Sequence, residues 1–381
     1  MAQGDKPYRV YRGGRTKGRV PLQRRVEQTP RRDGGRPNRP VTPAPTARRP
    51  RRLARRVAMT LVLLLLLVLV WAFASYFALA RALDGANQRL GPVALDEQSG
   101  LLLSDPTTTL LLGTDRGPGA GRVGERADSI MLVRTDPGRG RTSFLSIPRD
   151  LRVDVPDHGS AKINAAFQLG GPNLSVQTIK SFTGLQVNHV VVVDFRNFEQ
   201  LIDALGGVTI DVPEPILSNR FDCPFATQER CRRWNGWRFA AGEQTMSGRR
   251  ALLYSRVREN RLNPAENDLT RGERQQAVVR AIGDDVTSLS TLARMPVLAD
   301  DLIAPLATDL SAGQFAQFAW VHVRSGATLR CRLGGTPTSI GGESFLIGSE
   351  ENRNVILMFL GVAAPQPPPP GTGLFGPGCV G

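Results

Sequence analysis

Three short apolar runs decide the fold of this chain: Thr109-Leu110-Leu111-Leu112, Ala127-Asp128-Ser129-Ile130-Met131-Leu132-Val133 and Phe144-Leu145-Ser146-Ile147. Each run is bounded by turn residues and charged side chains, a pattern that is typical of buried strands. We therefore predict three strands between Leu110 and Asp150. Ligand sites in α/β sheets gather at strand ends, so the charged residues next to these runs are expected to converge.

Two carboxylates and two guanidinium groups lie at or next to the predicted strand ends: Asp115, Asp128, Arg116 and Arg149. Carboxylate oxygens are suited to Mg²⁺, and the planar fork of an arginine is suited to phosphate oxygens. This combination indicates a site for a divalent cation and a phosphate. The alternative is ordinary turn chemistry with surface ion pairs, and the stretch alone does not decide between the two.

The positive charge of the chain is confined to its first 56 residues. These contain 18 Lys and Arg against 3 Asp and Glu, which accounts for the whole formal net charge of +15 and leaves the remainder neutral. The segment is rich in Arg, Pro and Gly and has few large apolar residues, so it is predicted to be disordered. A basic tail of this kind can bind nucleic acid or anionic lipid head groups.

An apolar segment of 24 residues without a charge follows the tail, from Val57 to Ala80. A helix of about 20 apolar residues spans a bilayer, whereas the apolar part of a signal peptide is shorter, about 7–15 residues. We therefore predict an uncleaved membrane helix. Arg48 to Arg56 precede it directly, which places the N-terminus in the cytoplasm and everything after about residue 81 outside the cell.

The resulting organisation has five parts: a disordered basic cytoplasmic tail (1–56), a transmembrane helix (57–80), a stalk (81–105), an extracytoplasmic domain (106–362) and a Pro- and Gly-rich tail (363–381). All four cysteines lie in the outer part, and none shows the spacing of a metal site. One or two disulfides are expected. Cys223 with Cys231 and Cys331 with Cys379 is one possible pairing, and the sequence leaves the connectivity open.

Strands and helices alternate in the middle of the chain. We predict a strand at 189–194, a helix at 195–205, a strand at 208–212, a long irregular excursion at 213–240, helices at 246–254, 267–289, 291–302 and 311–323, and strands near 328–333 and 354–359. This order implies an α/β fold with helices on both faces of the sheet. Loops as long as the 213–240 excursion are uncommon unless they are functional.

Further cationic residues lie in the second half of this domain. Arg256 and Arg258 are two positions apart, whereas Arg271 and Gln275 are four apart and would share one face of a helix. Asp268 lies one turn earlier, where it could cap the helix or orient an arginine. Together with Arg149 and Lys162, these residues could surround a phosphate. The alternative is a solvated helix face.

The residues that carry this pattern also form seven ordered motifs. They are Leu112-Gly113-Thr114-Asp115-Arg116, Arg126-Ala127-Asp128-Ser129-Ile130-Met131, Ser146-Ile147-Pro148-Arg149-Asp150, Lys162-Ile163-Asn164-Ala165-Ala166, Asp203-Ala204-Leu205-Gly206-Gly207-Val208, Ala251-Leu252-Leu253-Tyr254-Ser255-Arg256-Val257-Arg258 and Asp268-Leu269-Thr270-Arg271-Gly272-Glu273-Arg274-Gln275-Gln276. In these motifs, and in its single N-terminal span, the chain resembles the LytR-CpsA-Psr family of membrane-anchored cell-wall glycopolymer ligases.

The resemblance implies an α/β/α sandwich over a mixed central sheet, with a long hydrophobic groove for a polyprenyl chain. It implies that a glycopolymer is taken from a polyprenyl-pyrophosphate carrier and attached to peptidoglycan through a phosphodiester. By position, Asp115 and Asp128 would hold Mg²⁺, one of them would act as the base, and Arg149 would be catalytic. The pyrophosphate-binding residues would be Arg116, Arg149, Lys162, Arg256, Arg258, Arg271 and Gln275, with Asp268 in support. Arg116 matches a less uniform position, and its role is open.

The chain departs from the family pattern in two places. The segment between Arg258 and Asp268 looks longer than usual, and the 213–240 excursion carries no family motif. Two other functions fit the same sequence features. The same site could hydrolyse polyprenyl pyrophosphate, or the chain could be a regulatory or nucleic-acid-binding protein. The predicted topology counts against the latter, because it puts the Asp and Arg residues across the membrane from any DNA. The Arg-, Gly- and Pro-rich composition suggests a high-GC Gram-positive source, and which wall polymer is the substrate stays open.

Overall fold

The structure is a computed structural model that describes residues 51–114, 127–263, 268–369 and 376–381. Two units are distinguished, 1–58 and 59–381. The described part of the first unit is the beginning of helix α1 (Arg51–Leu90). Most of the predicted disordered tail lies outside the described residues. The second unit contains the rest of α1 and the α/β domain.

Helix α1 is the one helix in the described part of the chain that is long and apolar enough to cross a membrane, by length and composition. Its side chains from Leu61 to Val70 are more than half exposed, whereas Leu79 and Leu83 are buried. The Trp71 Nε1 atom donates a hydrogen bond of 3.0 Å to the Ala293 carbonyl. The half of α1 after about residue 71 therefore packs on the domain, and the half before it presents the free apolar surface.

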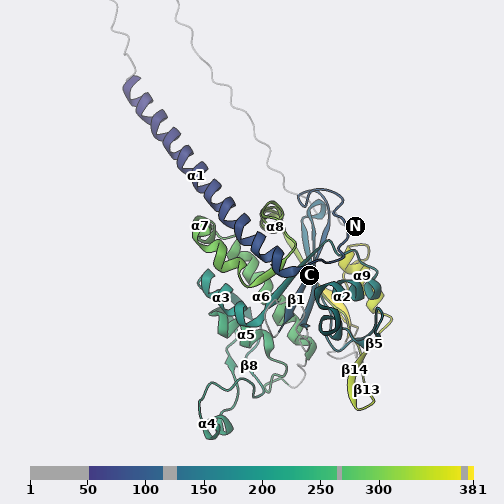
Figure 1. The fold of residues 1–381 in the computed structure, drawn as a ribbon. Coiled ribbons are helices and arrows are strands. Elements are labelled where there is room, and N and C mark those ends of the chain that lie inside the picture. Colours follow the sequence, from purple (N-terminus) through teal and green to yellow (C-terminus); the bar gives the residue numbers. More distant parts are fainter. Residues whose placement is uncertain (1–50, 115–126, 264–267, 370–375) are drawn as a thin grey trace, which may run out of the picture. The chain divides into compact units, whose positions relative to one another are not determined.

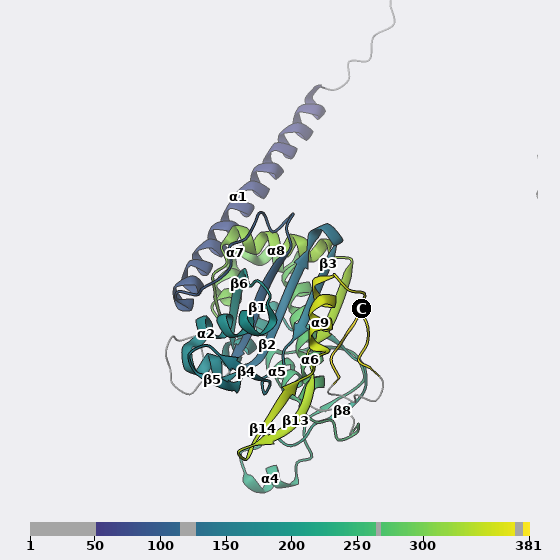
Figure 2. The same cartoon turned by 90° about the vertical axis from the view of Figure 1, so that its right-hand side faces the viewer.

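The centre of the domain is a seven-stranded sheet with the order β11-β6-β1-β2-β3-β12-β15 (Figure 2). Its strands are β1 (Thr107–Thr114), β2 (Ala127–Asp136), β3 (Arg141–Ser146), β6 (His189–Asp194), β11 (Leu306–Thr308), β12 (Ala327–Arg332) and β15 (Gly378–Val380). The pairs β1–β6 and β3–β12 are parallel, and the other pairs are antiparallel. The predicted mixed sheet is confirmed.

Helices cover both faces of this sheet (Figure 1). On one side lie α2 (Ala165–Thr183) and α9 (Asn352–Leu360). On the other lie α3 (Phe195–Leu205), α5 (Gly248–Arg256), α6 (Asp268–Val286), α7 (Leu289–Ile303) and α8 (Ala312–Arg324). Successive residues of β1 point to opposite faces of the sheet. Leu110 and Leu112 point to the face that α2 and α9 cover, where they are buried in the core. The predicted α/β/α sandwich is confirmed.

Short elements surround the sandwich. The two-stranded sheets are β4 (Arg152–Val155) with β5 (Gly159–Lys162), β7 (Val208–Val212) with β10 (Gly242–Met246), β8 (Ile216–Leu217) with β9 (Arg238–Phe239) and β13 (Gly335–Ile340) with β14 (Glu343–Gly348). A 3₁₀ turn, η1 (Pro137–Arg139), joins β2 to β3, and α4 (Gln228–Arg233) lies within the excursion predicted for 213–240.

Two expectations at the C-terminal end need correction. The predicted strand at 354–359 is wrong, because this run is helix α9. Its buried residues Val355, Met358 and Phe359 recur at helical spacing, and Gly361 ends the helix with a φ of 77°. A short apolar run fits a buried strand and a buried helix equally well. The segment 363–381, expected as a loose tail, ends in strand β15, which pairs with β12.

Both expected disulfides are present, Cys223–Cys231 and Cys331–Cys379. The first closes a short loop within the excursion around α4. The second joins β12 to β15 and ties the C-terminus to the sheet. Both half-cystines of this second bond are buried, each 1% exposed.

Candidate active site

A polar pocket lies at the edge of the sheet where β3 and β12 end. Its lining includes Asp128 from the start of β2, Arg149 from the turn after β3, and Arg271 and Gln275 from the first turns of α6. Strands β2 and β3 are antiparallel, and Met131 pairs with Ser146, so the start of β2 lies beside the end of β3. The sequence-predicted residues of three separate motifs therefore meet in one place.

Gly272 explains how α6 comes so close to the end of β3. A Cβ atom at this position would lie 3.1 Å from the Ser146 side chain, which is tighter than nearly all such contacts. With a larger residue here, the Ser146 side chain or the first turn of α6 would have to shift by a few tenths of an ångström. The glycine in the motif thus sets the distance between the α6 side chains and Asp128.

Arg149 is at the centre of a chain of charges. Its Nη1 lies 2.7 Å from Asp128 Oδ1, and its Nε lies 3.4 Å from Asp150 Oδ2. Lys162 Nζ lies 3.6 Å from the other oxygen of Asp150 and 4.0 Å from Glu343. Arg149 is 16% exposed and Lys162 19%. Lys162 is therefore coupled to the pocket through Asp150, although it does not belong to the pocket's described lining.

The two predicted α6 residues reach the start of β2, as their spacing of four requires. The Arg271 Nη2 atom donates to the Asp128 carbonyl at 3.4 Å, and the Ser129 hydroxyl donates to Gln275 Oε1 at 2.9 Å. Arg271 is only 7% exposed. These contacts fix the beginning of α6 against β2 and keep the guanidinium group of Arg271 at the pocket.

Arg256 and Arg258 lie outside the described lining of the pocket. Arg256 ends α5 and forms an ion pair with Asp222, and its guanidinium carbon lies 5.7 Å from the centre of the Phe221 ring. Arg258 is exposed. Both interactions of Arg256 are with the excursion, so this motif-free segment contacts a predicted site residue.

Three predicted site residues have side chains outside the part of the chain that the structure describes. Asp115 and Arg116 lie outside the described residues, directly after the end of β1 at Thr114. Asp268 is the first residue of α6, but its side chain is likewise outside the description. In the described part of the chain there is no group of three or more His, Cys, Asp or Glu residues arranged to hold a metal. The carboxylates described around Arg149 are those of Asp128 and Asp150.

An apolar cavity of about 260 Å³ continues along the same elements. Leu111 from β1, Val133 from β2 and Phe144 from β3 form its floor. Its other walls come from the later turns of α6 and from α8, and include Val279, Ile282, Val286, Phe315, Phe318 and Ala319. Within β2, β3 and α6, the residues at one end line the polar pocket, and those at the other end line the apolar cavity.

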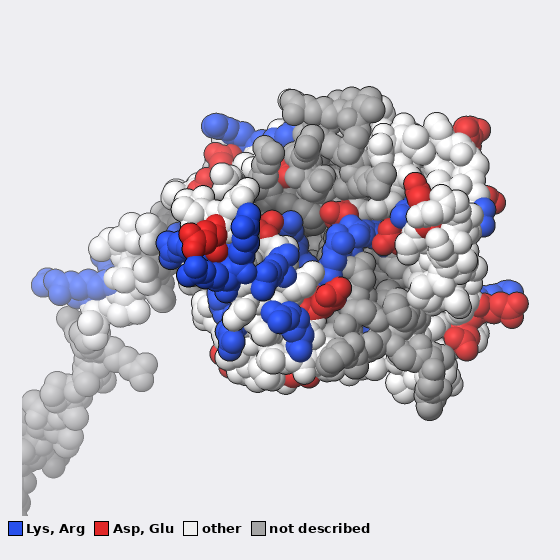
Figure 3. Space-filling view, turned by 90° about the horizontal axis from the view of Figure 1, so that it is seen from below, with Lys and Arg blue, Asp and Glu red and all other residues white. Residues whose placement is uncertain are grey.

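Charge is uneven on the face at which these strands end. Figure 3 shows Lys and Arg side chains gathered there, with a smaller number of acidic side chains among them. In the pocket itself, the described lining contains three arginines and one carboxylate: Arg149, Arg271, Arg332 and Asp128. An anion is the ligand that this balance favours.

Sequence reasoning gave no role to Asp150, Ser129 and Arg332. Asp150 is adjacent to Arg149 in its motif, and that adjacency could have indicated a partner. Ser129 likewise follows Asp128 directly. Arg332 stands alone at the end of a predicted strand, and no pattern singles it out. His189, the first residue of β6, is 3% exposed, and its Nδ1 lies 2.6 Å from Asp309 Oδ2, so it is part of the packed interior.

A model of the LytR_cpsA_psr family matches residues 79–328 of the chain. The chain is similar to the polyisoprenyl-teichoic acid–peptidoglycan teichoic acid transferase TagU of Oceanobacillus iheyensis, with 32% identity over 212 residues, or 54% of this chain and 59% of that protein. It is also similar to TagV of Bacillus subtilis, which has the same descriptive name, with 29% identity over 233 residues, or 59% of this chain and 56% of that protein. The chain thus spans less than two thirds of the length of these relatives. Among solved structures it is similar to TagT bound to LIIa-WTA, with a TM-score of 0.54 and 25% identity, covering 71% of this chain and 97% of that chain.

Proposed function

The chain belongs to the LytR-CpsA-Psr family, and on this premise we propose that it is a membrane-anchored phosphotransferase. It takes a glycopolymer from a polyprenyl-pyrophosphate carrier and attaches it to peptidoglycan through a phosphodiester. The names of its relatives describe transfer of teichoic acid to peptidoglycan from a polyisoprenyl carrier. The polymer that this chain transfers is left open in our proposal.

One observation carries the proposal: the polar pocket and the apolar cavity lie one after the other along β2, β3 and α6. On α6, Arg271 and Gln275 line the pocket, whereas Val279 and Val286 line the cavity. A helix rises 1.5 Å per residue, so Arg271 and Val286 are about 22 Å apart along its axis. A ligand that fits both has an anionic head and a long apolar tail, as a polyprenyl pyrophosphate does.

The proposed reaction needs positioning and charge stabilisation more than covalent help from the protein. Arg149 and Arg271 hold the pyrophosphate oxygens, which a guanidinium group can do with two parallel hydrogen bonds. A sugar hydroxyl of peptidoglycan attacks the phosphorus that carries the glycan. A new P–O bond forms, the bond to the lipid phosphate breaks, and polyprenyl phosphate leaves. The hydroxyl proton passes to a carboxylate, either Asp115 or Asp128.

We extend the proposal to Mg²⁺, held by Asp115 and Asp128. Asp128 fits this role because Arg149 bonds only its Oδ1, and no group among the described residues donates a hydrogen bond to its Oδ2. Mg²⁺ commonly uses one or two carboxylates, with waters and substrate phosphates as the remaining ligands. When bound, the ion would neutralise charge on the phosphate oxygens. Arg256, Arg258 and Lys162 are proposed as further pyrophosphate ligands.

The proposed topology keeps the site beside its lipid substrate. Helix α1 anchors the chain in the cell membrane with its basic N-terminus in the cytoplasm, and the α/β domain lies outside. The basic tail then meets anionic lipid head groups and no nucleic acid. The donor lipid lies in the same bilayer as the anchor, so its apolar tail need not cross water to enter the cavity.

The test uses the full chain in detergent, a short prenyl-pyrophosphate-linked glycan and a peptidoglycan oligomer. Mass spectrometry follows the linked product and free glycan phosphate, with Mg²⁺ or with EDTA. We expect linked product only with Mg²⁺, at least a hundredfold less for Asp128→Asn, and no change for the exposed control Asp154→Asn on β4. Release of glycan phosphate without linkage, for all acceptors tried, would replace the proposal with a pyrophosphate hydrolase.

A further inference from the structure

Arg332 is the last residue of β12 and lines the same polar pocket as Asp128, Arg149 and Arg271. Strands β3 and β12 run parallel, and Arg332 pairs with Ser146, the last residue of β3. Parallel neighbours end at the same edge of a sheet, which is where ligand sites gather in α/β folds. The position of Arg332 thus follows from the same topology that places Arg149.

The guanidinium group of Arg332 is held on two sides. Its Nε donates to the Gly376 carbonyl at 3.0 Å, and its Nη1 lies 3.1 Å from Glu273 Oε1 on α6. Its side chain is 13% exposed. An arginine has five N–H donors, and among the described residues no group accepts a hydrogen bond from Nη2 of Arg332. Donors therefore remain for a ligand in the pocket.

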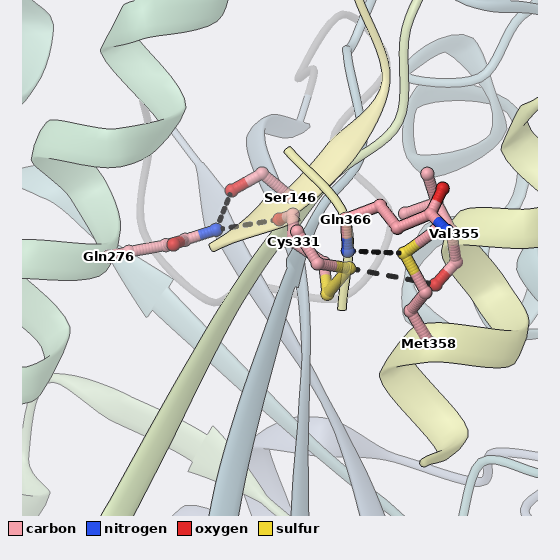
Figure 4. The surroundings of a disulfide bond; sticks show 7 residues. Ser146, Gln276, Cys331, Val355, Met358 and Gln366 are labelled. Carbon is pink, nitrogen blue, oxygen red and sulfur yellow. Dashed lines mark hydrogen bonds between the residues drawn. A yellow bond between two sulfur atoms is a disulfide. The ribbon is translucent and has the colours of Figure 1, made fainter. Parts of the chain in front are cut away.

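The C-terminal segment 376–381 supplies one of these two supports. Its strand β15 pairs with β12, so that Cys379 lies opposite Cys331 and Gly378 opposite Arg332. Figure 4 shows the disulfide between the two cysteines, beside Gln276 of α6. The Gln276 Nε2 atom donates to Ser146 Oγ at 2.8 Å and to the Cys331 carbonyl at 3.0 Å. The disulfide and this glutamine fix the residue directly before Arg332.

We propose that Arg332 is a further pyrophosphate-binding residue and that the disulfide-linked segment 376–381 holds its guanidinium group in position. This inference rests on the proposed function. Arg332 adds a third cation to a pocket with one described carboxylate. It comes from β12, whereas Asp128 comes from β2, on the other side of β3. Because its partner Glu273 is 56% exposed, water screens that ion pair, and the arginine keeps most of its attraction for a buried anion.

The chain offers a matched control for Arg332. Arg330 lies two residues earlier on β12, on the same face of the strand, but it is absent from the described lining of the polar pocket. The experiment measures binding to the full chain in detergent. Its probes are geranylgeranyl pyrophosphate and geranylgeraniol, which has the same tail and no phosphate. The variants are Arg332→Gln, Arg332→Lys and Arg330→Gln, and thermal unfolding checks that each is folded.

For Arg332→Gln we expect about tenfold weaker binding of the pyrophosphate and no more than a twofold change for the alcohol. Arg332→Lys should restore part of the loss, and Arg330→Gln should behave as wild type. Equal pyrophosphate affinity of wild type and Arg332→Gln would overturn the inference while leaving the proposed function intact. A wild-type chain that binds pyrophosphate no better than the alcohol would remove the proposed function, and the inference with it.

The supporting role of the C-terminal segment has its own variant. Cys379→Ser should weaken pyrophosphate binding about threefold, because Gly376 is then less firmly held. The double variant Arg332→Gln, Cys379→Ser should bind as weakly as Arg332→Gln alone, since the segment acts through that arginine. Wild-type affinity in a folded Cys379→Ser protein would overturn the positioning role, as would a further threefold loss in the double variant.

Discussion

The first turns of α6 line the polar pocket beside β2 and β3, whereas its later turns line the apolar cavity over the same two strands. At the first end, Arg271 and Gln275 contact the start of β2 through hydrogen bonds, and Gly272 lets the helix approach β3. At the other end, Val279 and Val286 face the apolar residues of the same strands across the cavity. Each polar contact depends on one atom pair, whereas the apolar wall depends on shape and volume. The first end should therefore be sensitive to single residues, and the second end to size alone.

The largest expected effect of this difference is at the polar end. Arg149→Gln removes the ion pair with Asp128 and the charge that holds the pyrophosphate. Transfer activity, measured as kcat/KM in detergent, should fall at least a hundredfold. This corresponds to about 2.7 kcal/mol at 1.36 kcal/mol per factor of ten. The affinity for geranylgeraniol should stay within twofold of wild type, because the cavity is untouched.

Arg152→Gln is the matched control, since Arg152 lies three residues later, is exposed on β4 and hydrogen-bonds Ser160. It should retain full activity. An equal loss of activity in Arg149→Gln and Arg152→Gln would show that the overall positive charge, and not the position of Arg149, supports the reaction. If Arg149→Gln also loses binding of the alcohol, the two ends are not separable in the way described above.

A smaller effect is expected when the apolar end is filled. Ala319 lies on α8 in the wall of the cavity, and Phe at this position would take up space needed by the lipid tail. Each buried CH₂ contributes about 0.8 kcal/mol, so loss of contact for two such groups gives about a tenfold weaker binding. We expect this loss for a geranylgeranyl chain and little change for a short dimethylallyl pyrophosphate.

The exposed neighbour Ala316 serves as control for this experiment, because it lies on the same helix and does not line the cavity. Ala316→Phe should bind both pyrophosphates as the wild type does. Equal losses for the long and the short lipid in Ala319→Phe would show that the cavity does not hold the tail. Thermal unfolding of both variants separates this outcome from overpacking of α8, which by itself costs about 1–3 kcal/mol.

The residues of the polar pocket could be predicted from the sequence, whereas the apolar cavity could not. Asp128, Arg149 and Gln275 belong to contiguous motifs with strong local signals, and they meet in the pocket as expected. The apolar cavity could not be located from the sequence by spacing alone, because Leu111 and Phe144 have the same alternation as residues that face the solid core. Only the packing of α6 and α8 decides which face of the sheet keeps an open space.

Other features escaped prediction because they depend on contacts that are distant in the sequence. Arg332 enters the pocket only because β12 pairs with β3, and its support by Gly376 depends on a disulfide over 48 residues. Asp222 meets Arg256 through the excursion, whose course no local pattern determines. The error at α9 has a different origin, since six apolar residues in a row fit either kind of element, and only the neighbouring layers choose between them.

The smallest expected effect concerns Asp285, which lies in the last turn of α6 and is not part of the described lining of the cavity. Burial raises the pKa of Asp285 above its ordinary value of 3.8, and the charge of Asp284 adds to this, while a hydrogen bond from the Thr209 backbone acts against it. The folded state then binds the proton more tightly than the unfolded state. Stability therefore rises as the pH falls through the raised pKa, and this contribution stops changing below about pH 3.8.

Asp285→Asn removes this titration. At pH 7 its free energy of unfolding should equal or exceed that of wild type by up to about 0.5 kcal/mol, and the advantage should vanish toward pH 4. Urea unfolding of the full chain in detergent at several pH values measures both curves, with the exposed Asp300→Asn on α7 as control. A wild-type protein that loses stability relative to Asp285→Asn as the pH falls would mean that Asp285 is stabilised as a carboxylate. A charged side chain would then stabilise the last turn of α6 as well, and the contrast between the two ends would be confined to the residues that line the pocket and the cavity.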